Sequence, residues 1–298
     1  MILTERRLRV PLLVELGGSW SRAVVLVHGP AGWGEMSPLP GYPCEPGRAR
    51  AAAEESACRP WPAAVRTSVP VNVLVPALPP DEAAALAAGH RWVKVKVGDP
   101  AGVGRDVDRV AAVRSALGPG PAVRVDANGA WDLDTAVDAI SHLSRYDIEL
   151  VEQPVATIED LAAVRRKVSV PVAADECVRD LGDARRLRDL AAADAVVLKV
   201  QPLGGVRAAL EVAEAAGVAA IVTSMYETSV GLAAGLALAA ALPELPYACG
   251  LGTANLLAAD VVPDPLLAVD DQLEVRRPEP SPLLLDRLDS GLEGEGLG

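Results

Sequence analysis

Six side chains that can do acid/base or metal chemistry recur at regular intervals through the middle of the chain. They are, in chain order, Lys94, Lys96, Asp126, Glu152, Asp175 and Lys199. From Lys96 onward the successive separations are 30, 26, 23 and 24 residues, each about the length of one strand with its helix. All six lie at or near the ends of short apolar runs. In a closed barrel of parallel strands, such ends face one common mouth.

The three acids predict a metal site. A buried carboxylate without a partner either takes up a proton or needs a cation. No histidine or cysteine accompanies Asp126, Glu152 or Asp175 at these strand ends, and an all-oxygen ligand set favours Mg²⁺, with Mn²⁺ as a substitute, over zinc. We therefore predict these three residues as metal ligands, and Asn128 as a hydrogen-bonding partner of one ligand oxygen.

The lysines predict proton transfer. Lys94 and Lys96 are two residues apart, so their amines lie on the same face of a strand. A neighbouring ammonium ion and a nearby dication both disfavour protonation, which favours Lys96 as the base that removes a proton. A metal bound to a substrate carboxylate would stabilise the resulting anion. Lys199 would serve as a second acid/base or as an electrostatic stabiliser.

Each residue also has a purely structural interpretation. Lys94 and Lys96 would extend from a strand end into solvent, Asp126 would form an Asx turn or cap a helix, and Glu152 and Asp175 would cap the helices that follow them. The catalytic interpretation therefore depends on five successive strand ends agreeing.

Weaker signals predict a substrate-binding region near the seventh and eighth apolar runs. We assign Ser224, Gly252 and Thr253 to it, because glycine lets a substrate approach the backbone. Neither a histidine nor an aspartate stands where it would activate Ser224, so nucleophilic catalysis is not predicted.

The elements that must position these residues follow a β/α rhythm. Eight apolar runs span residues 69–75, 92–97, 122–127, 148–152, 170–174, 195–200, 219–223 and 247–251. Helical patterns between them span 81–88, 105–117, 134–143, 158–167, 183–191 and 206–215. No Gly-x-Gly-x-x-Gly follows the first run, which favours a closed barrel over a doubly wound open sheet. The predicted fold class is α/β, a TIM-like (β/α)7β barrel.

The rhythm stops at both ends of the chain. Residues 8–16 and 22–27 read as antiparallel strands, 32–41 as a Gly/Pro-rich loop and 49–58 as a helix. We predict an α+β capping domain over residues 1–68, completed by parts of 255–298, and a barrel domain over 69–254. Residues 291–298 are expected to form a disordered tail.

Composition narrows the function classes. The net charge is −12, so nucleic acid and anionic membranes are not expected partners. The four cysteines are scattered and the first ten residues carry charges, which predicts neither a disulfide framework nor a signal peptide. With no uncharged apolar stretch of about 18 residues, the expectation is a cytoplasmic protein, monomeric or a small homo-oligomer, acting on a small carboxylate.

Together these segments resemble the enolase superfamily. The resemblance is carried by residues 32–41, Lys94-Val-Lys96, residues 126–131, Val151-Glu-Gln-Pro154, residues 174–176 and residues 198–205, and it covers nearly the whole chain. It implies a capping module over a barrel, with Mg²⁺ held by acids on the third, fourth and fifth strands. Lys-x-Lys on the second strand with a lysine on the sixth is similar to the muconate-lactonizing subgroup.

Within that subgroup, the short length and the segment Gly250-Leu-Gly-Thr253 resemble the o-succinylbenzoate synthase family. The resemblance implies a syn dehydration in menaquinone biosynthesis: Lys96 removes the proton and returns it to the leaving hydroxyl, Lys199 stabilises the anion and Lys94 tunes Lys96. Residues 32–41 would exclude water and contact the succinyl tail.

Two alternatives remain open at this point. An N-succinylamino acid racemase, or a related epimerase or cycloisomerase, would use Lys96 and Lys199 as opposed bases. A barrel that binds metal without catalysis would use its lysines only to neutralise the acids.

Overall fold

The computed structural model describes residues 1–289 and begins with a three-stranded antiparallel sheet. The strands β1 (Thr4–Leu16), β2 (Ser19–Gly29) and β3 (Gly32–Met36) pair in that order. Gly17 and Gly18 both have positive φ, as a tight hairpin turn requires. The sequence interpretation of residues 32–41 as a loop is wrong for its first half: β3 pairs with β2 from Val25–Met36 to Gly29–Gly32. The loop begins after Met36.

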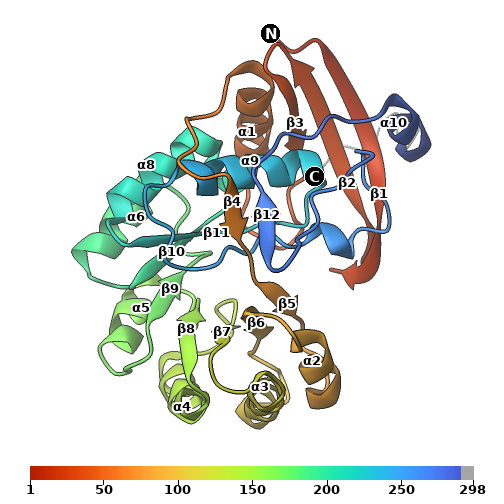
Figure 1. Ribbon diagram of the computed structural model, residues 1–298. Helices are drawn as coiled ribbons and strands as arrows, with labels where there is room; N and C mark the ends of the chain where they lie inside the picture. The colour runs from red at the N-terminus through yellow and green to blue at the C-terminus, as the bar shows by residue number, and fades with distance from the viewer. Residues whose placement is uncertain (290–298) are drawn as a thin grey trace.

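Both faces of this sheet are covered. Helix α1 (Pro46–Cys58) places Ala53 and Ala57 against Val25 and Val27 on one face. It approaches so closely that a Cβ on Gly34 would lie 1.9 Å from the carbonyl oxygen of Ala53. The other face, with Leu8, Val10, Leu12, Val24 and Leu26, packs against Val230, Leu257, Val261, Val262 and Leu285. The C-terminal segment therefore returns to the N-terminal sheet (Figure 1).

A seven-stranded parallel sheet follows, in the order β11-β10-β9-β8-β7-β6-β5. Its strands are β5 (Val73–Val75), β6 (Trp92–Lys96), β7 (Ala122–Asp126), β8 (Ile148–Glu152), β9 (Val172–Ala174), β10 (Ala195–Leu198) and β11 (Ala219–Val222). The connecting helices are α2 (Pro80–Ala87), α3 (Val103–Leu117), α4 (Leu133–Leu143), α5 (Ile158–Arg165), α6 (Leu181–Asp189), α7 (Val200–Leu203), α8 (Val206–Ala216) and α9 (Ser229–Ala241). In Figure 1 the helices lie outside the curled sheet.

The first and eighth predicted strands differ from expectation. Residues 69–75 are not one strand, because β4 (Ser68–Pro70) pairs with β12 (Gln272–Glu274) while β5 pairs with β6. Residues 247–251 form no named strand. They contribute only two parallel bridges, Val71 with Cys249 and Thr223 with Gly250, and these link the two edges of the sheet. The predicted sixth strand also ends early, so Lys199 precedes helix α7 instead of lying within the strand.

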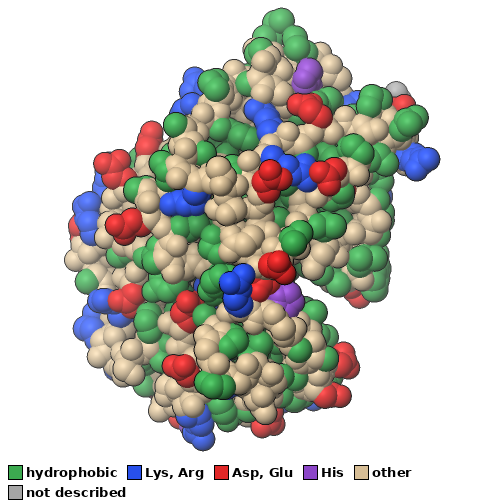
Figure 2. Space-filling model, viewed as in Figure 1, with side chains coloured by type: hydrophobic (Ala, Val, Ile, Leu, Met, Phe, Trp, Pro, Cys, Tyr) green, Lys and Arg blue, Asp and Glu red, His purple; other side chains and the backbone are tan. Residues whose placement is uncertain are grey.

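The remaining elements complete the fold. Short 3-10 helices, η1 (Ser144–Tyr146) and η2 (Ala254–Leu256), join the longer elements, and α10 (Pro282–Leu288) lies beside β1. The predicted tail, 291–298, lies outside the described residues. None of the helices within residues 1–289 has the length and apolar content that crossing a membrane requires. On the face shown in Figure 2, acidic and basic side chains are interspersed.

Candidate active site

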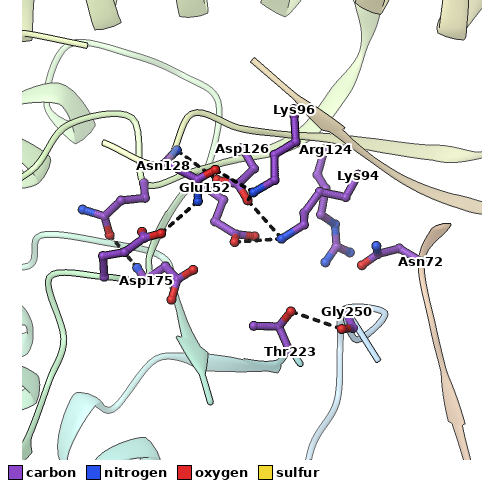
Figure 3. Close-up of polar contacts among 12 residues, drawn as sticks. Asn72, Lys94, Lys96, Arg124, Asp126, Asn128, Glu152, Asp175, Thr223 and Gly250 are labelled. Atoms are coloured by element: carbon purple, nitrogen blue, oxygen red, sulfur yellow. Dashed lines mark hydrogen bonds and ion pairs between the residues drawn. The ribbon is translucent and has the colours of Figure 1, made fainter. Parts of the chain in front are cut away.

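The centre of the site is a buried lysine between two carboxylates. Lys94 Nζ donates to Asp126 Oδ2 and to Glu152 Oε1, at 3.0 Å in each case, as Figure 3 shows. The strands bring these groups together because Lys96 is in register with Asp126, and Asp126 with Glu152. Asp126 and Glu152 have at most 1% of their surface exposed.

Asp126 also accepts hydrogen bonds from Lys96 and from the backbone of Asn128. Lys96 Nζ donates to Asp126 Oδ2 and, at 2.6 Å, to Asn128 Oδ1. The backbone N–H of Asn128 donates to Asp126 Oδ1 at 3.0 Å, so the Asx-type contact and the ion pairs coexist. Asn128 Nδ2 donates to Glu176, which makes Asn128 the link from the Lys96 side of the site to the fifth strand end.

Asp175 and Lys199 form the second half of the site. Lys199 Nζ donates to both carboxylate oxygens of Asp175. Tyr42, from the loop after β3, donates its hydroxyl to Asp175 Oδ1 at 2.8 Å and places its ring 4.3 Å from Lys199 Nζ. Helix α6 is capped by Asp180, so Asp175 does not serve as the cap of that helix.

Burial and neighbouring charges shift the pKa values of the three acids in different directions. Burial, reinforced by the charge of Asp126, raises the pKa of Glu152 to about 7. Burial also opposes ionisation of Asp126, but Lys94 and Lys96 outweigh it and hold the pKa of Asp126 below its usual range. Burial raises the pKa of Asp175. Glu152 and Asp175 therefore both hold a proton more readily than an exposed carboxyl group, whereas Asp126 favours its ionised form.

A cavity of about 90 Å³ opens at this mouth. Nine of the ten residues predicted from the sequence line it, and the tenth, Glu152, lies behind Lys94. Ser224 Oγ lies 2.8 Å from Thr253 Oγ1 and donates to the Gly250 carbonyl, which places the predicted substrate-binding residues together. Sequence analysis missed several lining residues: Leu39, Tyr42, Asn72, Leu74, Glu176, Thr223 and Tyr226.

The donor set fits a hard divalent cation by residue type. Three buried carboxylates come from adjacent strand ends, and neither histidine nor cysteine is among the residues that line the cavity. In the observed side-chain positions, lysine amines bond the oxygens a metal would take, and no group of three or more acidic, histidine or cysteine side chains within residues 1–289 is gathered closely enough to hold an ion. Binding would require the lysines to yield those oxygens.

The lysine content of the chain points to the same place. Only four lysines occur among its 28 basic residues, and Lys94, Lys96 and Lys199 are three of them. Lys167, the fourth, is exposed on the turn after α5. Arginine supplies the basic charge elsewhere, so three of the four primary amines of the chain lie in this one cavity.

Comparison with known proteins agrees with this arrangement. The enolase C-terminal domain-like family matches residues 80–282, and the enolase N-terminal domain-like family matches residues 8–57. Among solved structures, muconate lactonizing enzyme from Pseudomonas fluorescens superimposes with a TM-score of 0.85 at 23% identity, covering 96% of this chain and 98% of that one. A dipeptide epimerase from Enterococcus faecalis gives a TM-score of 0.79 at 26% identity, covering 93% and 97%. The predicted barrel with a capping domain is thus confirmed.

Curated relatives are more similar in sequence. The o-succinylbenzoate synthase of Thermobifida fusca is 57% identical over 279 residues, which is 92% of this chain and 88% of that protein. The o-succinylbenzoate synthase of Mycolicibacterium smegmatis is 45% identical, covering 94% and 88%. The resemblance stated from the sequence is confirmed: this chain belongs to the o-succinylbenzoate synthase family of the enolase superfamily.

Proposed function

We propose that this chain catalyses the syn dehydration of 2-succinyl-6-hydroxy-2,4-cyclohexadiene-1-carboxylate to 2-succinylbenzoate, the step that o-succinylbenzoate synthases supply to menaquinone biosynthesis. One observation carries the proposal beyond family membership. Lysine amines lie on both flanks of three buried acids in one cavity. That arrangement suits removal of a proton next to a carboxylate.

Lys96 is the proposed acid/base. Its neutral amine takes the proton from the carbon beside the substrate carboxylate, the carbon–oxygen bond then breaks, and the departing oxygen takes the proton from the Lys96 ammonium and leaves as water. Lys199 contributes a positive charge from the Asp175 side throughout. Lys94 stays charged, because Glu152 and Asp126 outweigh burial and raise its pKa.

We further propose that Asp126, Glu152 and Asp175 hold Mg²⁺, with Asn128 orienting the Asp126 side through its contacts to Lys96 and Glu176. A bound Mg²⁺ would stabilise negative charge that develops on the substrate carboxylate. Ser224, Gly252 and Thr253 are proposed to bind the substrate, because all three line the cavity and Ser224 contacts Thr253.

Two further proposals concern the division into domains and the location of the protein in the cell. We propose a division into a capping domain over residues 1–68, completed by C-terminal segments, and a barrel over 69–254. A cytoplasmic location is supported by four free cysteines, as expected in a reducing compartment.

The decisive test is an absorbance assay for o-succinylbenzoate formation, run with Mg²⁺ and with EDTA. Wild type should be active with Mg²⁺ and inactive in EDTA. Lys96→Ala should lose about 10²–10⁴-fold in kcat, the range of general acid/base catalysis. Lys167→Ala, which removes the exposed lysine, is the matched control and should keep full activity. Activity that persists in Lys96→Ala would refute its role.

The site also supports a second candidate, racemisation of N-succinylamino acids. The observation that favours it is the pair of amines on opposite flanks, Lys96 on Asp126 and Lys199 on Asp175. Incubation of each enantiomer of an N-succinylamino acid in deuterated water would reveal it through α-proton exchange and inversion. Exchange at a rate rivalling dehydration would place this reaction first.

A further inference from the structure

A second buried polar cluster lies beside the site and has no role in the chemistry above. It joins the N-terminal sheet to the barrel between β3 and the start of α9. We name it the loop clamp, and its members are Arg22, Glu35, Ser37, Gln201, Glu227 and Thr228. All six are at most 5% exposed, although polar groups are costly to bury without partners.

Glu35 is the centre of the loop clamp. Its carboxylate accepts from Ser37 Oγ at 2.6 Å, from the backbone N–H groups of Thr228 at 3.2 Å and Gly231 at 3.0 Å, and from the Thr228 hydroxyl. Thr228 and Gly231 belong to the first turn of α9, where unpaired N–H groups favour a negative charge. A capping-sheet carboxylate thus closes the N-terminus of a barrel helix.

The segment after Glu35 is held from two further sides. The backbone N–H of Ser37 donates to Gln201 Oε1 at 2.8 Å, and Gln201 Nε2 donates to Ser37 Oγ at 3.2 Å and to Glu227 Oε1 at 3.3 Å. Arg22 donates to the carbonyl oxygens of Ser37 and Pro38. The backbone at residues 35–38 therefore has fixed partners in both the sheet and the barrel.

Both ends of the loop clamp lead to the active site. Gln201 is two residues after Lys199, in the short helix α7. Ser37 begins the loop that carries Leu39 and Tyr42 into the cavity, where Tyr42 contacts Asp175 and Lys199. The loop clamp thus ties the start of this loop to the strand end that supplies Lys199.

We propose that Glu35 is a positioning residue: it anchors the loop after β3 against α9 and α7, so that Leu39 and Tyr42 close over the substrate. The proposal rests on the proposed function, because the bound ligand is the substrate of that site. Glu35 need not touch the substrate. Instead, Glu35 affects how tightly the closed loop holds the substrate.

The chemistry of the contacts requires a carboxylate at this position. All four partners of Glu35 are donors, so an amide at the same place would turn its NH₂ group toward at least one N–H or O–H. An unpaired buried donor costs about 1–3 kcal/mol. Glu35→Gln keeps the size of the side chain but breaks the anchor, which makes it a sharp probe.

Steady-state kinetics at about pH 8 give the first test, with Glu55→Gln as the matched control. Glu55 also joins the two parts of the chain, from α1 to Arg207 of α8 at 2.8 Å, but it lies away from the loop. Glu35→Gln should raise KM at least tenfold and change kcat less than threefold, whereas Glu55→Gln should leave KM unchanged. Equal effects of the two variants, or an unchanged KM in Glu35→Gln, would overturn the proposal.

Hydrogen–deuterium exchange gives a test that needs no catalytic activity. The backbone N–H of Ser37 donates to Gln201 Oε1 and that of Tyr42 to the Leu39 carbonyl, so exchange over residues 37–44 reports loop release. Glu35→Gln should exchange there at least fivefold faster than wild type and Glu55→Gln at the wild-type rate; equal rates would count against the proposal. Ser37→Ala, which removes a single donor, serves if Glu35→Gln fails to fold, and it should show the same effects at smaller size. If wild type lacks dehydratase activity but the variants show this exchange pattern, the proposed function alone is refuted.

Discussion

Replacing Lys94 with methionine tests the electrostatics of the site most directly. The substitution keeps an unbranched side chain of similar length and removes the positive charge. Lys94 is 8% exposed, and its amine lies 3.0 Å from an oxygen of Asp126 and 3.0 Å from an oxygen of Glu152. The variant therefore leaves two buried carboxylates without the ammonium ion that bridges them.

Breaking a buried ion pair by removing one partner costs about 3–5 kcal/mol, because the remaining charge is uncompensated. For proteins of about 150–250 residues, each kcal/mol lowers Tm by roughly 2–4 °C, and this chain of 298 residues lies just above that range. We expect the metal-free Lys94→Met variant to melt on the order of 10 °C below wild type. Mg²⁺ would replace the lost charge, so its apparent affinity should rise about tenfold, equivalent to ~1.4 kcal/mol.

The assay is thermal unfolding of both proteins in EDTA and across a Mg²⁺ titration, with Lys167→Met as control. The control removes an exposed lysine and should melt within about 1 °C of wild type, as surface substitutions usually do. A Lys94→Met variant with the wild-type Tm in EDTA would refute the buried bridge. A Mg²⁺-induced shift no larger than that of wild type would refute competition between Lys94 and the ion.

Three further predictions follow from other contacts. Burial raises the pKa of Glu152 to about 7 and also raises the pKa of Asp175 in the absence of metal, so Mg²⁺ must displace protons from these ligands. Its affinity should rise as the pH rises through about 7, and calorimetry in two buffers should detect proton release below pH 7; an affinity independent of pH would contradict this. Tyr42→Phe removes a donor that occupies Asp175 Oδ1, so calorimetry should find Mg²⁺ binding a few-fold tighter, and weaker binding would contradict this. Gly34→Ala would place a Cβ 1.9 Å from the Ala53 carbonyl oxygen, which should cost about 1–3 kcal/mol in denaturant unfolding.

The barrel and the acidic residues were predictable because their signal is local and repeated. Each apolar run is short and followed by a helical pattern, so the spacing alone places Asp126, Glu152 and Asp175 at equivalent ends. The strand errors have physical causes. Residues 32–36 read as a loop because the ten-residue segment 32–41 contains three glycines and two prolines. The glycines at 32 and 34, however, serve an unusual φ and close packing within a strand.

The missed lining residues lie where no periodicity operates. Tyr42 sits in an irregular loop, and only the folded chain brings it to Asp175, 133 residues away. Asn72 falls at the break between β4 and β5, and a run read as one strand gives no reason to single it out.

The covering of the first sheet has a consequence for synthesis on the ribosome. Strands β1 and β2 emerge first, but Leu8, Val10 and Leu12 find their partners Leu257, Val261 and Leu285 only when the last part of the chain has been made. Until then this apolar face stays open to water or to a chaperone, since contacts between distant parts of a chain form late. A nascent chain stalled before residue 257 should therefore bind a holdase at its N-terminal hairpin, and release it once residues 257–285 have left the exit tunnel.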